Sequence, residues 1–170
     1  MQTKFHRLGV EDGLSQSAVT QILHGSRGFM WFGTHEGLNR YDGYGFTIYK
    51  HDSADSTSLP GSQISALHED TAGRIWVGTR SGLALYDREK DAFRRFNPSR
   101  TDGFATTEIV IQAIVSVDDG PGAGIWVGSS SRGIFYLPQE DTHLIHISIE
   151  TNYTGAQSVR SLCLLYTSDA

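Results

Sequence analysis

The sequence predicts an all-β protein that is part of a β-propeller, with about three four-stranded blades plus the start of a fourth. Two observations lead to this prediction. Trp31, Trp76 and Trp126 lie 45 and 50 residues apart inside closely similar segments. The chain also has 19 glycines and 11% aromatic residues, which indicates short strands joined by frequent turns. A period of roughly 20–50 residues is typical of repeat folds, and four strands per ~45 residues correspond to one propeller blade.

The repeated segments share more than the tryptophan. They read Gly28-Phe-Met-Trp-Phe-Gly-Thr34, Gly73-Arg-Ile-Trp-Val-Gly-Thr79 and Gly124-Ile-Trp-Val-Gly-Ser129. In each, a glycine follows the tryptophan by two residues and a tyrosine follows it by ten, and Gly133-Ile134 of the third copy is displaced by one place. The repeated positions are Trp31, Gly33, Gly37 and Tyr41; Trp76, Gly78, Gly82 and Tyr86; and Trp126, Gly128 and Tyr136.

Each unit is expected to contain four short strands. In the first unit they run near Val19–Leu23, Phe29–Gly33, Leu38–Tyr41 and Phe46–Tyr49. Turns rich in Gly, Asp, Asn, Ser and Pro separate these segments. The predicted organisation is an N-terminal strand or lead-in at 1–14, blades at 15–61, 62–108 and 109–157, and the start of a fourth blade at 158–170.

Within such a blade the repeated residues have structural roles. Trp31 is expected to fill the layer between adjacent blades. Gly33, which has no side chain, would let its strand pass close to a neighbour. His35-Glu36-Gly37 falls at the turn between the second and third strands.

Composition narrows the possible partners. The net charge is −5 and no basic run or basic aromatic stripe occurs, so nucleic acid is not an expected partner. No apolar run approaches the ~18 residues of a membrane helix, and the start MQTKFHRLG lacks the apolar core of a signal peptide.

Cys163 is the only cysteine, so no internal disulfide can form. No metal-ligand or phosphate-loop spacing is present, and no cofactor is expected.

These motifs resemble the two-component-regulator propeller repeat. The resemblance runs from Phe5 to about Leu162 and is carried by Phe5-His-Arg-Leu-Gly-Val-Glu-Asp-Gly-Leu-Ser-Gln16, by Gly28–Thr34 with Gly37-Leu-Asn-Arg-Tyr-Asp-Gly43, and by the second copy, Glu69–Asp87. It implies the N-terminal periplasmic sensor of a membrane-bound bacterial receptor with a histidine kinase or diguanylate cyclase output. It also implies an extracytoplasmic ligand, often a glycan or oligosaccharide, and a homodimeric full-length receptor in the inner membrane.

The length indicates a fragment. By the family's pattern about seven blades, or ~315 residues, would close a ring. We therefore expect the remaining blades and a membrane-linked output module to belong to the same longer chain. Cys163–Ala170 resembles the translation of a sequencing adapter, which would make it non-native; the alternative is the true start of blade four.

The candidate binding residues are those that differ between copies, and no catalytic residue is expected. His35-Glu36 aligns with Arg80-Ser81 and with Ser130-Ser-Arg132. If these turns face a ligand, His35, Glu36, Arg80 and Arg132 would hydrogen-bond a polar or anionic group; otherwise they are solvent-exposed turns. The paired carboxylates Glu69-Asp70 and Asp118-Asp119 are expected to cap turns.

The sequence thus favours a non-catalytic, ligand-sensing module. One alternative is a propeller enzyme acting on glycans, which would need unique buried carboxylates near the channel. The other is an intracellular protein-interaction scaffold. Because three blades cannot close a ring, the isolated chain is expected to expose its end blades and to be marginally stable or prone to aggregation.

Overall fold

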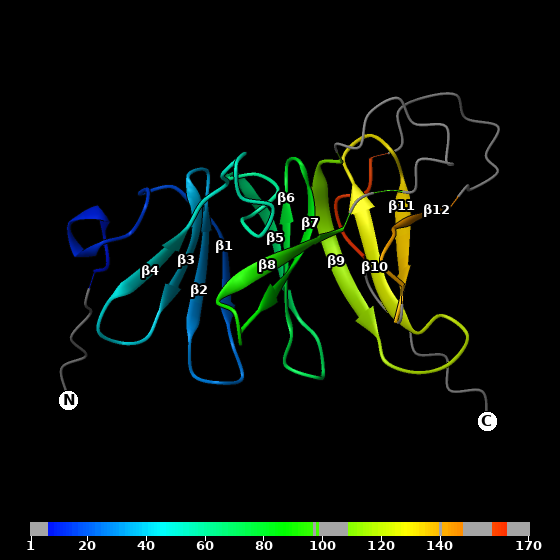
Figure 1. Ribbon diagram of the computed structural model, residues 1–170, viewed down its shortest axis with the longest axis horizontal. Helices are drawn as coiled ribbons and strands as arrows, with labels where there is room; N and C mark the ends of the chain where they lie inside the picture. The colour runs from blue at the N-terminus through cyan, green and yellow to red at the C-terminus, as the bar shows by residue number, and fades with distance from the viewer. Residues whose placement is uncertain (1–6, 97, 99–108, 140, 148–157, 163–170) are drawn as a thin grey trace.

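The computed structural model describes residues 7–96, 98, 109–139, 141–147 and 158–162, which form three four-stranded antiparallel sheets standing side by side (Figure 1). Blade 1 contains β1 (Val19–His24), β2 (Met30–Thr34), β3 (Gly37–Tyr41) and β4 (Phe46–Tyr49). Blade 2 contains β5 (Ile64–Glu69), β6 (Ile75–Thr79), β7 (Gly82–Asp87) and β8 (Ala92–Phe96). Blade 3 contains β9 (Ile111–Val117), β10 (Gly124–Ser129), β11 (Ile134–Pro138) and β12 (Ile145–Ile147). The predicted all-β propeller fold is confirmed, whereas residues 163–170, the suspected adapter sequence, lie outside the described residues.

The strands of each sheet follow chain order, and the first strands of neighbouring blades contact one another. Each blade therefore places its first strand, β1, β5 or β9, at the inner edge and its fourth at the outer edge. The inner strands of blades 1 and 2 each contain a bulge, at Thr20 and Ser65, where the register against the second strand shifts.

A glycine contact joins successive blades. A Cβ atom on Gly33 would lie 2.6 Å from Ile64 Cγ2, and one on Gly78 would lie 2.5 Å from Ile111 Cγ2. These distances are too short for any side chain, so the glycine of each second strand lets the first strand of the next blade approach. The same contact recurs after blade 3, where a Cβ on Gly128 would lie 2.7 Å from Val159 Cγ1.

Buried side chains fill the layers between the blades. The layer between blades 1 and 2 includes Trp31, which is 3% exposed, with Leu59, Ile75 and Tyr86. The layer between blades 2 and 3 forms a second cluster: Ala66, Trp76, Leu83, Phe96, Ile109, Ile111, Ile125, Val127, Phe135, Leu137 and Leu144. Burial of this apolar area is the main stabilising contribution to the blade-to-blade packing.

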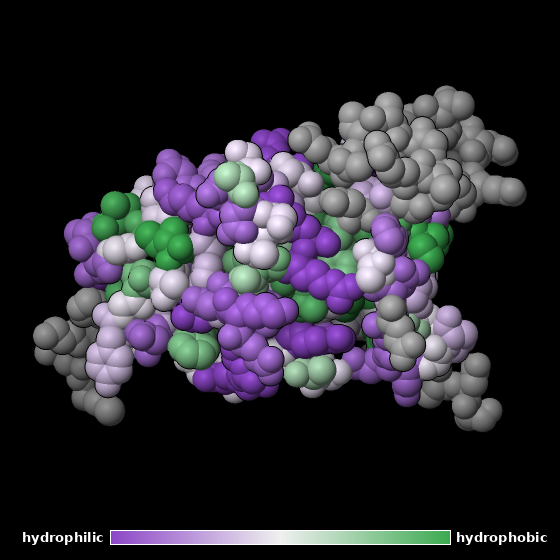
Figure 2. Space-filling view, in the orientation of Figure 1, coloured by the Kyte–Doolittle hydropathy of each residue, from purple (hydrophilic) through white to green (hydrophobic). Residues whose placement is uncertain are grey.

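The free side of blade 1 carries exposed apolar side chains. Val19, Ile22 and Ile48 are 38%, 63% and 42% exposed, and Figure 2 shows apolar groups at this end of the molecule. Val19 begins β1 as Ile64 and Ile111 begin the inner strands of the later blades, where they pack against a glycine. Among the described residues no preceding blade covers Val19.

The third blade departs from the repeat at its tyrosine. Trp31 pairs with Arg40 and Trp76 pairs with Leu85, but Trp126 pairs with Tyr136. Thr34 faces Gly37 and Thr79 faces Gly82, but Ser129 bonds to Gly133, so the turn is one residue longer in blade 3. The count of ten residues from the tryptophan therefore places Tyr136 one register position away from Tyr41 and Tyr86. Leu137 holds their place instead.

The lead-in packs on blade 1. Residues 7–18 contain a 3-10 turn, Val10–Asp12, rather than a strand. The backbone N–H of Ser15 donates to Asn39 Oδ1 at 2.8 Å, which ties the segment to β3. In the part of the chain that the structure describes, no helix is long and apolar enough to cross a membrane.

Candidate functional site

The four predicted binding residues lie in equivalent turns at one end of the blades. His35 and Glu36 occupy the turn between β2 and β3, Arg80 the turn between β6 and β7, and Arg132 the turn between β10 and β11, along the upper edge in Figure 1. His35, Glu36 and Arg80 are exposed and Arg132 is half-buried. The structure thus places all four at the same end of the fold.

The contacts of these residues stay local. The N–H of His35 donates to Gln16 Oε1 at 3.3 Å, and the Glu36 carboxylate lies 3.9 Å from Lys50 Nζ. Arg80 Nη1 donates to Gln63 Oε1 at 3.2 Å. None of these contacts of His35, Glu36 and Arg80 links one turn to another, so the role of the four residues in binding stays a prediction.

A buried hydroxyl fixes the backbone of each turn. Thr34 Oγ1 donates to the carbonyl of Gly37 at 3.0 Å and accepts the N–H of Glu36 at 3.0 Å. Thr79 and Ser129 make the corresponding bonds in blades 2 and 3, and all three hydroxyl residues are fully buried. The hydroxyl thereby closes all three turns in the same way, although the third turn is one residue longer, while the side chains at their tips differ.

The paired carboxylates have structural partners. Asp70 is 5% exposed, and its carboxylate accepts from the N–H and Nε of Arg74 and from Trp76 Nε1. Desolvation alone would raise the pKa of Asp70, but the hydrogen bonds from Trp76 and Arg74 outweigh it and hold the pKa below its usual value. Asp118 accepts from Thr71 of blade 2 at 2.6 Å. The capping role predicted for Asp70 is therefore the one observed, which leaves this carboxylate without a free oxygen for acid–base chemistry.

A pocket opens between blades 1 and 2 at the opposite end from the β2–β3 turns. Its volume is about 270 Å³, and it lies between the β1–β2 turn of blade 1 and the β5–β6 and β7–β8 turns of blade 2. Phe29, Trp31, Ile75 and Tyr86 supply apolar surface. Four arginines and three carboxylates also line it, so its side chains carry one net positive charge.

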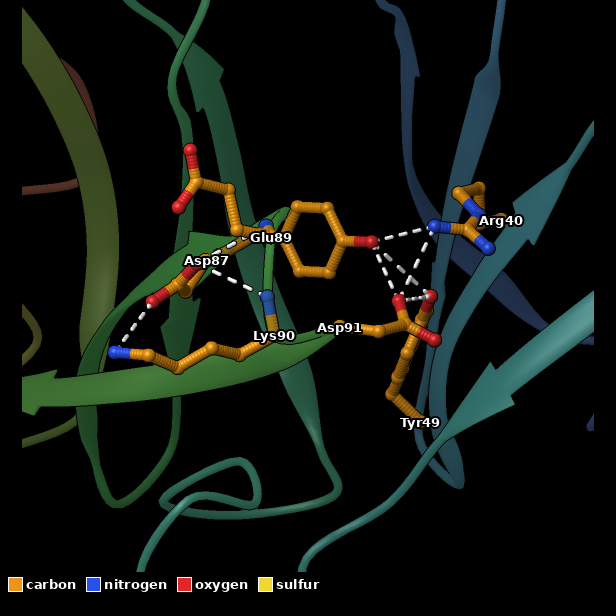
Figure 3. Close-up of polar contacts among 7 residues, drawn as sticks. Arg40, Tyr49, Asp87, Glu89, Lys90 and Asp91 are labelled. Carbon is orange, nitrogen blue, oxygen red and sulfur yellow. Dashed lines mark hydrogen bonds and ion pairs between the residues drawn. The ribbon is translucent and has the colours of Figure 1, made fainter.

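Arg40, one of the four arginines of this pocket, joins a polar network between blades 1 and 2. Figure 3 shows Arg40 and Tyr49 of blade 1 facing Asp91 of the β7–β8 turn of blade 2. Arg40 Nη1 lies 3.2 Å from Asp91 Oδ1, and the hydroxyls of Tyr49 and Tyr86 donate to the same oxygen. The guanidinium also lies 5.2 Å from the ring centroid of Phe29, close enough for a cation–π contact.

The protonation of this network follows from its burial and hydrogen bonds. Burial, followed by the hydrogen bond to Asp91, raises the pKa of both Tyr49 and Tyr86, which remain donors at neutral pH. Desolvation would raise the pKa of Asp91, but the hydrogen bonds from Tyr49 and Tyr86 and the charge of Arg40 outweigh it and lower the pKa. Asp91 therefore stays a carboxylate that accepts all three donors.

The β7–β8 turn is shaped to present Asp91. Tyr41 pairs with Phe46 five residues later, but Tyr86 pairs with Phe93 seven residues later, so the turn in blade 2 is longer. Asp91 has φ +49°, the one positive value at a non-glycine residue in the described part of the chain. Such a conformation is uncommon outside glycine, although aspartate tolerates it better than most residues.

Sequence reasoning did not single out Arg40, Tyr49 or Asp91. A usable signal existed, because Arg40 stands where the second copy has Leu85 and Tyr49 stands where it has Phe96. In both cases a polar residue replaces an apolar one at a position facing the next blade. For metal ions, the described residues contain no group of three or more His, Cys, Asp or Glu side chains arranged to hold one.

Comparison with known proteins identifies the repeat. A family model described as two component regulator propeller matches residues 13–36 and 58–81. Histidine kinase P4 of Formosa agariphila is 50% identical over 48 residues, which are 28% of this chain and 4% of that protein.

Solved structures of extracellular domains from two-component systems are also similar to this chain. The extracellular domain of the putative hybrid two component system BT3049 from B. thetaiotaomicron matches with a TM-score of 0.70 and 32% identity, covering 84% of this chain and 20% of that one. The corresponding domain of BT4673 matches with a TM-score of 0.64 and 21% identity, covering 82% of this chain and 20% of that one, and supports the fold alone. The chain therefore spans about a fifth of these solved domains.

Proposed function

We propose that this chain, which carries the two-component regulator propeller repeat, is part of the ligand-sensing module of a membrane-bound bacterial receptor. The observation that carries the proposal is the 32% identity over 84% of the chain to the extracellular domain of a putative hybrid two component system. The complete receptor would place this propeller in the periplasm, act as a homodimer and transmit to a histidine kinase or diguanylate cyclase.

The proposed module binds its ligand without transforming it. A glycan or oligosaccharide is the class of ligand that we propose, with His35, Glu36, Arg80 and Arg132 as candidate contacts. The variation of these residues over turns that are closed by the same buried hydroxyl supports recognition. The commitment of Asp70 to Trp76 and Arg74 weighs against a glycan hydrolase, which needs two free carboxyl groups ~5–9 Å apart.

The test uses the full-length protein encoded at the native locus, in cells with a reporter of its output. A panel of oligosaccharides is supplied outside the cells, and one class is expected to change the reporter signal. Replacing Arg80 by alanine is expected to weaken that response, whereas replacing the exposed Ser53 in a loop of the same end is expected not to. A reporter that ignores every member of the panel would contradict the proposal.

A second arm separates the proposal from its alternatives. Protease added to intact spheroplasts is expected to digest the propeller, whereas an intracellular scaffold would be protected. Incubation of the purified protein with the same oligosaccharides is expected to release no new reducing ends, whereas a glycan hydrolase would release them.

A further inference from the structure

The indole N–H of Trp31 lacks the acceptor that the other two tryptophans of the repeat have. Trp76 Nε1 donates to Asp70 Oδ2 and Trp126 Nε1 donates to the carbonyl of Gly122, both at 2.9 Å. Trp31 is 3% exposed, yet its Nε1 has no acceptor among the described residues, and Trp31 lines the pocket between blades 1 and 2. Among the described residues, Gln112 Oε1 is the one fully buried side-chain polar atom without a partner, so the Trp31 N–H is accessible from the pocket and not sealed in the core.

The cause is a single residue. The turns after β1 and β5 are closed by the same backbone bond, from Gly25 N–H to the carbonyl of Phe29 and from Asp70 N–H to the carbonyl of Arg74. Gly25 therefore stands where blade 2 has Asp70. A Cβ on Gly25 would lie 3.3 Å from Trp31 Nε1, so a side chain there would lie beside the indole N–H. Gly25, like Trp31, lines the pocket.

The surroundings of Trp31 partly match those of a bound carboxylate in blade 2. There, the Asp70 carboxylate is held by an indole N–H and by the guanidinium of Arg74. In blade 1 Phe29 holds the position of Arg74, and the guanidinium of Arg40, paired with Asp91, lies over the face of the Trp31 ring, 6.0 Å from its centroid, and lines the same pocket. The pocket thus offers a carboxylate an indole N–H without an acceptor and a lining with one net positive charge.

The rest of the pocket limits the size and shape of a ligand. Its volume of about 270 Å³ suits a molecule built on a single ring. Phe29, Trp31 and Tyr86 are flat aromatic surfaces, and Ile75 adds an aliphatic one. A flat body with one apolar face would pack against these side chains.

We propose that the pocket between blades 1 and 2 binds a small monocarboxylate with a flat, single-ring body, whose carboxylate accepts the N–H of Trp31 beside Arg40. The proposal adds a second ligand contact, far from the β2–β3 turns, to the sensing function proposed above and rests on that function only for its biological role. A sugar acid and an aromatic acid both have this chemistry, and the experiment distinguishes them.

The direct test is the indole region of a ¹H–¹⁵N correlation spectrum of the full chain, with the Trp31 signal assigned from Trp31→Phe. Phenylacetate and glucuronate are the carboxylate probes, and 2-phenylethanol and glucose are their neutral counterparts. At least one carboxylate is expected to shift the Trp31 indole proton downfield, while the Trp76 and Trp126 signals, whose protons already have acceptors, stay in place. Equal shifts with a neutral counterpart, or no shift with either carboxylate, would overturn the proposal.

A variant gives an independent test. Gly25→Asp would supply the carboxylate from the chain itself, as Asp70 does in blade 2, and is expected to weaken probe binding at least about tenfold and to raise the melting temperature. Gly45→Asp adds the same charge in an open turn of blade 1, where a Cβ meets nothing within 4 Å, and is expected to bind the probe normally. Unchanged binding by Gly25→Asp would overturn the proposal, and the wild-type spectrum decides it if that variant does not fold.

The two proposals can fail separately. Probe binding to the purified chain without any reporter response would leave this pocket a binding site and count against the sensing function. A reporter that responds to oligosaccharides equally in the wild type and in Gly25→Asp would keep the sensing function and exclude this pocket from it.

Discussion

The interface between blades 1 and 2 holds the larger pocket and has an arginine beside its tryptophan, whereas the interface between blades 2 and 3 holds a smaller pocket and has a leucine there, although both pack a buried apolar cluster and use the same register positions. Arg40 faces Trp31 across the strand pair in blade 1, and Leu85 faces Trp76 in blade 2. The pocket at the first interface measures about 270 Å³, and the one at the second about 60 Å³. A repeat protein needs its blades to pack, but it needs no arginine to do so.

The difference separates architecture from candidate function. The contacts of Gly33 with Ile64 and of Gly78 with Ile111 are common to both interfaces, so they belong to the fold. Arg40 and the unpaired indole of Trp31 occur only at the first interface. Variants can test whether the glycine contacts are needed for stability and whether Arg40 is not.

The largest loss of stability is expected when the glycines common to both interfaces are replaced. Gly78→Val inserts a branched side chain where even a Cβ would lie 2.5 Å from Ile111, and should lower the free energy of unfolding by about 3 kcal/mol or more. Gly33→Val should cost a similar amount at the other interface. Chemical denaturation measures both, with Gly45→Val as the control in an open turn. A cost below 1 kcal/mol, which is about the level of surface substitutions, would show that the close approach is not required.

A smaller loss of stability is expected when an arginine is introduced at the second interface. Leu85→Arg places a guanidinium against the apolar cluster of the second interface, where Phe96 and Leu137 stand in place of the two tyrosines, and should cost about 2–3 kcal/mol. Leu85→Met, which keeps the volume and stays apolar, serves as the control in the same denaturation experiment. Similar stabilities for the two variants would mean that the interfaces are interchangeable.

Replacing the arginine of the first interface should cost less stability. Arg40→Leu gives the first interface the residue of the second, and should cost about 1 kcal/mol or less, because the side chains of Arg40 and Asp91 are 21% and 53% exposed and solvent screens their ion pair. Thermal unfolding of this variant beside Arg40→Lys measures the part that needs the planar guanidinium. A loss as large as that of Gly78→Val would make Arg40 a structural residue first.

The smallest effect concerns pH. The folded-state pKa of Asp70 is lowered, so its carboxylate contributes stability that is fully present above the unfolded pKa of ~3.9 and is lost as the pH falls through the folded value. Stability measured between pH 5 and pH 2 should therefore fall less steeply in Asp70→Asn than in the wild type. Parallel curves for the two proteins would assign the acid sensitivity to other carboxylates.

Much of the fold could be predicted because structurally equivalent positions recur at similar spacings along the sequence. The positions of Trp31, Trp76 and Trp126 indicated three blades, and the glycine two residues later indicated a close approach. Tyr136 shows the limit of counting, since one extra residue in the preceding turn moved it by one register position. The candidate site was less accessible, because Arg40 and Asp91 are 51 residues apart and meet only across two blades.

The sequence by itself determined the period, the strand pattern and the glycine contacts, because these depend on local turns and on side-chain size. Only the tertiary structure decided which residues face each other between blades. It showed that Gly25 takes the place of Asp70, which leaves the Trp31 N–H open to a pocket while Trp76 is capped. That outcome depends on the orientation of side chains across a packed layer, and no spacing along the chain records it.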